Sequence, residues 1–129
     1  MKPTILLIED NEQNRYLATF LLEAHGYGIV PAVDGAQGIE LAGRLLPQLI
    51  LLDIQLPLMD GYAVARALRR NPALANIPIV AVTSYAMAGD REKALAAGCN
   101  GYLEKPINPE TFVPEIERFL NPPPNRTAP

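Results

Sequence analysis

Three short runs of uninterrupted apolar residues constrain most strongly what this chain can fold into. They read "TILLI" at 4–8, "LILLD" at 49–53 and "IVAVT" at 79–83. A strand with one face in water alternates apolar and polar residues, whereas continuous apolar runs are typical of strands that are buried on both faces. Such strands occur in parallel sheets with helices packed on both sides, so the runs predict a layered α/β fold.

Helical patterns alternate with the strand patterns, and two further strand patterns, at 28–33 and 101–103, complete five strand–helix units. The helical patterns lie at 14–26, 36–46, 62–70, 91–98 and 109–120. We therefore predict a doubly wound, flavodoxin-like fold with five helices around a five-stranded parallel sheet in the order 2-1-3-4-5. Pro114 falls inside the last helical pattern, so that helix is expected to bend or to start late.

Length and composition suit one domain with one core, because the chain has 129 residues of which 49% are hydrophobic. We place this domain at 1–120 and expect the "NPPPNRTAP" segment at 121–129 to be a disordered, proline-rich tail. The start "MKPTILLIED" is neither a signal peptide nor a membrane span, so we expect a cytoplasmic protein. A net charge of -3 without a Lys/Arg cluster argues against direct nucleic-acid binding.

Carboxylates stand where the first and third predicted strands end. Glu9 and Asp10 follow the run at 4–8, and Asp53 ends the run at 49–53. Ligands of such sheets bind beyond the carboxyl ends of the strands. If the order is 2-1-3-4-5, the first and third strands are neighbours, and we expect these acids to converge on one pocket. Three close carboxylates repel one another, and a cluster that offers only oxygen ligands suits Mg²⁺.

Two further residues at strand ends complete the predicted pocket. Lys105 follows the strand pattern at 101–103, and Thr83 ends the run at 79–83. The ammonium and the metal would together hold Asp53 ionised as a nucleophile and neutralise an arriving phosphoryl group. Thr83 could donate a hydrogen bond to a phosphoryl oxygen.

These motifs, in this order, resemble the receiver domain of two-component response regulators over nearly the whole chain. They are the pair Glu9 and Asp10, Asp53 followed by "LPLMDG", Thr83 in "VAVTSYA", and Lys105 in "YLEKP". The resemblance implies that Asp53 takes a phosphoryl group from a phosphohistidine on a sensor histidine kinase or a histidine phosphotransfer protein. It implies a signalling role, in which the chain catalyses only its own phosphorylation and slow dephosphorylation.

The resemblance also implies the metal ligands. Mg²⁺ would be bound by Asp10, Asp53 and the backbone carbonyl of Gln55, and Glu9 would act through bound water.

A switch is implied as well, formed by Thr83 and Tyr102. Their movement would change the surface made by the last two helices and the strand between them, which a downstream protein reads. Gln55 and Tyr85 are expected to tune the lifetime of the phosphoaspartate. After Leu120 there is no room for an attached effector, so we expect output through a protein contact, unless the chain is a receiver fragment of a longer protein such as a hybrid histidine kinase.

Two other functions use similar residues. A phosphatase of the haloacid-dehalogenase type also has a strand-end aspartate and Mg²⁺, but it typically needs a second acid two positions later, where this chain has Gln55. A flavodoxin-like binder of nucleotide or flavin needs a turn that accepts phosphate. The turn "EDNEQN" is acidic and lacks glycine, so it would repel phosphate.

The single histidine and the single cysteine are interpreted as structural. His25 stands at the end of the first helical pattern, where an imidazole suits the helix dipole. Cys99 lies among apolar and small residues, as a buried cysteine does, and one cysteine cannot form an internal disulfide.

Overall fold

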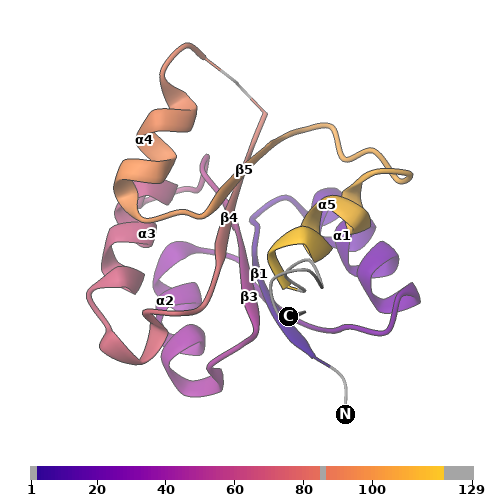
Figure 1. The fold of residues 1–129 in the computed structure, drawn as a ribbon, viewed down its shortest axis with the longest axis horizontal. Helices are drawn as coiled ribbons and strands as arrows, with labels where there is room; N and C mark the ends of the chain where they lie inside the picture. Colours follow the sequence, from indigo (N-terminus) through magenta and orange to yellow (C-terminus); the bar gives the residue numbers. More distant parts are fainter. Residues whose placement is uncertain (1–2, 85–86, 121–129) are drawn as a thin grey trace, which may run out of the picture.

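The sheet has five parallel strands in the order β2-β1-β3-β4-β5, in a computed structural model that describes residues 3–84 and 87–120 (Figure 1). The strands are β1 (Thr4–Ile8), β2 (Gly28–Ala32), β3 (Leu49–Asp53), β4 (Ile79–Thr83) and β5 (Gly101–Glu104). The helices are α1 (Glu12–Ala24), α2 (Gly35–Leu45), α3 (Gly61–Arg69), α4 (Asp90–Ala97) and α5 (Phe112–Leu120), with a short 3-10 helix, η1 (Pro72–Leu74), before β4. The predicted fold class is confirmed.

Helices cover both faces of the sheet, with α2, α3 and α4 on one side and α1 and α5 on the other (Figure 1). Successive residues of β1 point to opposite faces, so Leu6 and Ile8 belong to one core cluster while Ile5 and Leu7 belong to the other. Every residue of β3 is buried. The two covered faces are the physical reason for the continuous apolar runs.

The turn that leads from β3 into α3 is fixed by two adjacent residues. Asp60 caps α3, because its Oδ1 accepts a hydrogen bond from the Ala63 N–H at 2.8 Å. The Gly61 N–H donates to the Ile54 carbonyl at 2.9 Å, and a Cβ at Gly61 would lie 2.5 Å from the Ile54 Cα. Only glycine fits this close approach, which holds the loop after Asp53 in place.

The helix boundaries differ from the predicted ones where polar caps act. α1 begins at Glu12, earlier than its apolar pattern, because the Asn11 side chain accepts a hydrogen bond from the Asn14 N–H at 2.9 Å. α5 begins at Phe112, so the late start that Pro114 predicted is confirmed. Pro114 is tolerated because N–H groups in the first turn of a helix have no intrahelical partner.

Some predictions fall on parts of the chain that the structure does not describe. The proline-rich segment 121–129 and Tyr85 lie outside the described residues. The tail, the domain boundary and the role of Tyr85 therefore stay predictions. Across residues 3–84 and 87–120, no helix is long and apolar enough to cross a membrane.

Candidate functional site

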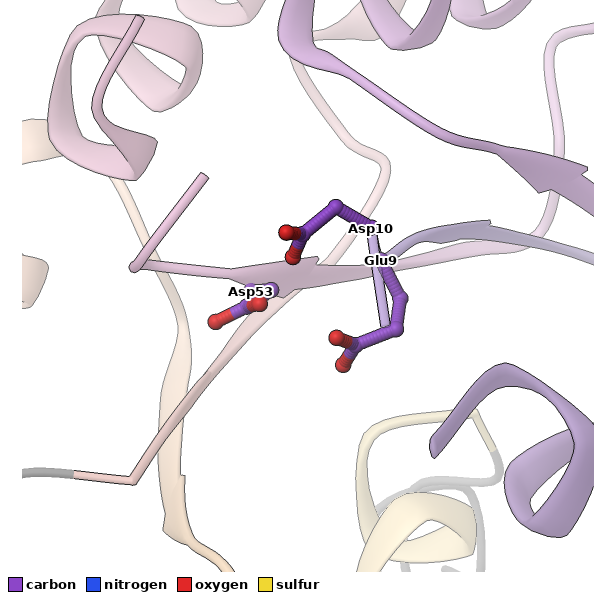
Figure 2. A group of neighbouring side chains, drawn as sticks. All are labelled: Glu9, Asp10 and Asp53. Atoms are coloured by element: carbon purple, nitrogen blue, oxygen red, sulfur yellow. The ribbon is translucent and has the colours of Figure 1, made fainter. Parts of the chain in front are cut away.

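The predicted acids meet at the carboxyl edge of the sheet. β1 and β3 are neighbours, and their register pairs Ile8 with Leu52, so Glu9 and Asp53 come next on the two strands. One carboxylate oxygen from each of Glu9, Asp10 and Asp53 lies within 4.8 Å of the others (Figure 2). The topology therefore brings together residues that are more than forty positions apart in the sequence.

Lys105 reaches the same pocket from the segment after β5. Its Nζ lies 2.8 Å from Glu9 Oε1 and 3.5 Å from Asp53 Oδ2. The sequence predicted the lysine but not that Glu9 would be its nearer partner. Glu9 and Asp53 are each only 4% exposed, whereas Asp10 is exposed. The pocket thus has a buried floor and one acid at its open side.

The Asp53 carboxylate has a raised pKa. Burial is the main cause, because it disfavours the charged form, and the negative charge of Glu9 adds to it. The Gln55 N–H, which donates to Asp53 Oδ1 at 2.9 Å, and the charge of Lys105 lower the pKa and offset part of the rise. One lysine does not fully compensate the buried acids, so a further cation would be favoured here.

Two loop contacts that the sequence did not reveal hold the pocket together. The Asn11 N–H donates to Glu9 Oε2 at 3.2 Å, so both carboxylate oxygens of Glu9 have partners. The Gln55 side chain accepts from the Ser84 N–H at 3.0 Å and so joins the loop after β3 to the loop after β4. No pattern of apolar periodicity or motif spacing predicts such local hydrogen bonds.

The acid cluster fits Mg²⁺ by its chemistry. It offers carboxylate oxygens only, the hard ligands that Mg²⁺ prefers, and it is open to solvent at Asp10, where retained waters could complete an octahedral shell. The raised pKa of Asp53 points the same way, because a metal ion would relieve the unfavourable burial of its charge.

The sequence model of the response regulator receiver domain matches residues 5–117, most of the chain. The chain belongs to the response regulator receiver family. This assignment favours a signalling domain over a metabolic enzyme, and it decides against the phosphatase and the flavodoxin-like binder as the family of this chain.

Relatives of this receiver domain are similar over nearly its full length. The polar-differentiation response regulator DivK of Brucella anthropi is 39% identical over 120 residues, which cover 93% of this chain and 98% of DivK. Among solved structures, the receiver domain of the sensor histidine kinase PA1611 from Pseudomonas aeruginosa is 36% identical, with a TM-score of 0.86 and coverage of 93% of this chain and 98% of that one. That structure has a magnesium ion coordinated in the active-site cleft.

The chemotaxis protein CheY4 of Vibrio cholerae has the same fold. Its TM-score is 0.88 at 27% identity, and the match covers 93% of this chain and all of CheY4. Receiver domains of separate regulators and of sensor kinases therefore share the architecture of this receiver domain.

Of the two predicted switch residues, Thr83 lies at the same edge of the receiver sheet, whereas Tyr102 lies further back, opposite Ala81 in the middle of β4. Thr83 ends β4 and is 2% exposed, and it lies one position beyond Val82, which pairs with Asp53. Tyr102 lies on β5, half-buried, and its ring packs against the core cluster on the α3 side. Among the described residues, nothing forms a hydrogen bond with its buried hydroxyl.

The remaining candidates have structural surroundings. The His25 ring Nδ1 lies 2.9 Å from the Leu21 carbonyl oxygen at the end of α1, away from the acids. Cys99 is buried, and burial raises the pKa of its thiol to about 11, so it remains a protonated, unreactive side chain near neutral pH. Both interpretations from the sequence agree with these positions.

Proposed function

We propose that this receiver domain accepts a phosphoryl group on Asp53 from a phosphohistidine of a sensor histidine kinase or a histidine phosphotransfer protein, in the cytoplasm. One observation carries the proposal. The Asp53 carboxylate lies at a strand end, with one oxygen within 4.8 Å of carboxylate oxygens of Glu9 and Asp10, and its Oδ2 lies 3.5 Å from the Lys105 Nζ. A nucleophile, a positively charged ammonium and a set of candidate metal ligands are thereby in one pocket.

In the transfer, one bond to phosphorus forms on this protein and one breaks on the partner. An Asp53 carboxylate oxygen attacks phosphorus, the phosphorus–nitrogen bond of the phosphohistidine breaks, and the imidazole keeps the bonding electrons and takes up a proton. Lys105 neutralises negative charge on the phosphoryl oxygens as the bond forms. The Gln55 N–H, already bonded to Asp53 Oδ1, orients the carboxylate and leaves Oδ2 on the side of Lys105.

Mg²⁺, when bound, would add positive charge that stabilises the transferring phosphoryl group. Asp10, Asp53 and the Gln55 carbonyl are the proposed ligands. Both oxygens of Glu9 already bind Lys105 or the Asn11 N–H, which supports a role for Glu9 through bound water.

The phosphorylated state would be slow to hydrolyse. Gln55 stands at the position where an aspartate-nucleophile phosphatase has a second acid, and an amide cannot act as a general acid or base. Its side chain is engaged with the Ser84 N–H instead. We propose that Gln55 and Tyr85 set the lifetime of the phosphoaspartate, as the family resemblance implies.

Output would pass through the face formed by α4, β5 and α5. A groove of about 350 Å³ lies there, lined among others by Arg91, Tyr102 and Glu115. Because Tyr102 also faces the core, a change in its position would alter this groove. A downstream protein that contacts the face could therefore detect the movement of Thr83 and Tyr102.

Intact-mass measurement after incubation with acetyl phosphate and Mg²⁺ tests the phosphoacceptor. We expect the mass of one phosphoryl group on the wild type and none on Asp53→Asn, because an amide is not a nucleophile. Asp60→Asn is the matched control, since asparagine can still cap α3, and it should be labelled like the wild type. Undiminished labelling of Asp53→Asn at another residue would refute the assignment.

A further inference from the structure

Arg15 binds the backbone of the loop that carries two of the three acids. It is the fourth residue of α1, and its side chain is half-buried. Its Nη1 donates to the carbonyl oxygens of both Glu9 and Asp10, each at 3.0 Å. Neither the motifs nor the proposed chemistry accounts for this residue.

The shared donor fixes the shape of the loop. Successive residues of an extended strand point in opposite directions, so two successive carbonyls reach one nitrogen only if the chain bends. The bend is anchored at both ends, because the Glu9 N–H donates to the Ala32 carbonyl at 2.9 Å and the Asn11 N–H donates to Glu9 Oε2 at 3.2 Å. The backbone conformation between these anchors determines where the Glu9 and Asp10 side chains point.

We infer that Arg15 is a positioning residue that holds the acid-bearing loop in the conformation that binds Mg²⁺. The inference rests on the proposed function, since it assumes a metal at the acid cluster. A positioning role and a purely electrostatic role predict opposite changes in Mg²⁺ affinity when Arg15 is replaced. A guanidinium near a metal site repels the cation, so loss of its charge alone would tighten Mg²⁺ binding, whereas loss of the loop anchor would weaken it.

Titration with Mg²⁺ alone, followed by amide NMR shifts of Asp10 and Gln55, separates the two roles. We expect Arg15→Ala to raise the Kd for Mg²⁺ about tenfold, the scale found when groups that orient metal ligands are removed. Arg15→Lys keeps a donor that can reach one carbonyl, so its Kd should lie between those of Arg15→Ala and the wild type. Arg44→Ala, which removes an exposed positive charge from the last turn of α2, should leave the Kd unchanged.

The outcomes distinguish this inference from the proposed function. If the wild type does not bind Mg²⁺, the proposed metal site is wrong. If the wild type binds Mg²⁺ and Arg15→Ala binds it as tightly or more tightly, the positioning role is wrong. Should Arg15→Ala fail to fold, Arg15→Lys decides alone, because a Kd equal to or below that of the wild type overturns the inference and a raised Kd supports it.

Discussion

The β1–β3 half and the β4–β5 half of the sheet differ in the interactions that their polar side chains lack. At the β1–β3 half, the buried carboxylates of Glu9 and Asp53 share one ammonium among the described residues, that of Lys105. At the β4–β5 half, Thr83 and Tyr102 are uncharged, and the Tyr102 hydroxyl has no hydrogen-bond partner within the described part of the chain. The first half therefore has more buried negative charge than Lys105 compensates, whereas on the second half the Tyr102 hydroxyl is left without a partner in the described segments of the chain.

The helices beside the two halves are anchored differently as well. α3, which follows the loop after Asp53, buries Val64 and Leu68 and is capped by the Asp60 side chain. In the part of the chain that the structure describes, no side chain caps α4 with a hydrogen bond, and the buried residues of α4 are Ala94 and Ala97. Because the buried residues of α4 are two alanines, moving α4 would expose less apolar surface than moving α3.

Removal of the Lys105 ammonium should have the largest effect on the stability of the fold. Lys105→Met leaves Glu9 and Asp53 buried without their counter-charge, so we expect the free energy of unfolding in the absence of metal to fall by about 3 kcal/mol. Urea unfolding in EDTA measures it. Lys93→Met removes an exposed charge from α4 and should change the stability little. Equal stabilities of the two variants would show that the acids do not depend on Lys105.

Mg²⁺ should stabilise the wild type, because it binds the assembled acid cluster and not the unfolded chain. At about ten times its Kd the gain is about 1.4 kcal/mol. Thermal melting with EDTA and with millimolar Mg²⁺ checks this. Asp10→Asn should reduce the gain, since it weakens metal binding, and by relieving repulsion it should raise the metal-free stability. A metal-free melting temperature of Asp10→Asn below that of the wild type would show that repulsion between Asp10 and the other two acids does not destabilise the fold.

Asp53→Asn should raise the metal-free stability by about 1 kcal/mol near neutral pH, the scale typical of a single substitution. The folded pKa of Asp53 is raised above the ordinary 3.8, so the folded state binds more protons between these two values, and the wild type loses stability as pH rises through that window. The difference in free energy of unfolding between the variant and the wild type should therefore disappear below about pH 3.8. Urea unfolding across pH in EDTA measures it, and a difference independent of pH would contradict the assignment.

The smallest effect on stability is expected from a substitution at the β4–β5 half. Tyr102→Phe removes a buried hydroxyl without a partner, so the free energy of unfolding should rise by about 0.5 kcal/mol or stay unchanged. Tyr27→Phe is the contrasting control, because the Tyr27 hydroxyl donates to Glu117 Oε2 at 2.6 Å and its loss should destabilise the fold by about 1 kcal/mol. If both variants lose stability equally, the Tyr102 hydroxyl is satisfied in solution and the contrast between the two halves fails.

The sequence by itself determined the layered fold and, once the doubly wound order 2-1-3-4-5 was assumed, the meeting of the acids. These follow from local patterns, because apolar runs with no alternation require cover on both faces and parallel strands bring their carboxyl ends to one edge. Asp53, Asp10 and Lys105 could be placed at one edge of the sheet on that ground, and in one pocket once the strand order was assumed. Even the late start of α5 followed from Pro114 and its local sterics.

Only the tertiary structure decided how the side chains share their partners. Lys105 lies nearer to Glu9 than to Asp53, Arg15 binds two carbonyls of the acid-bearing loop, and the Tyr102 hydroxyl is buried without a bond among the described residues. Differences below one ångström decide which of two competing oxygens an ammonium prefers, because charge pairing weakens with distance and with exposure to water. Spacing along a chain does not contain such differences, since they arise from packing between segments that are distant in sequence.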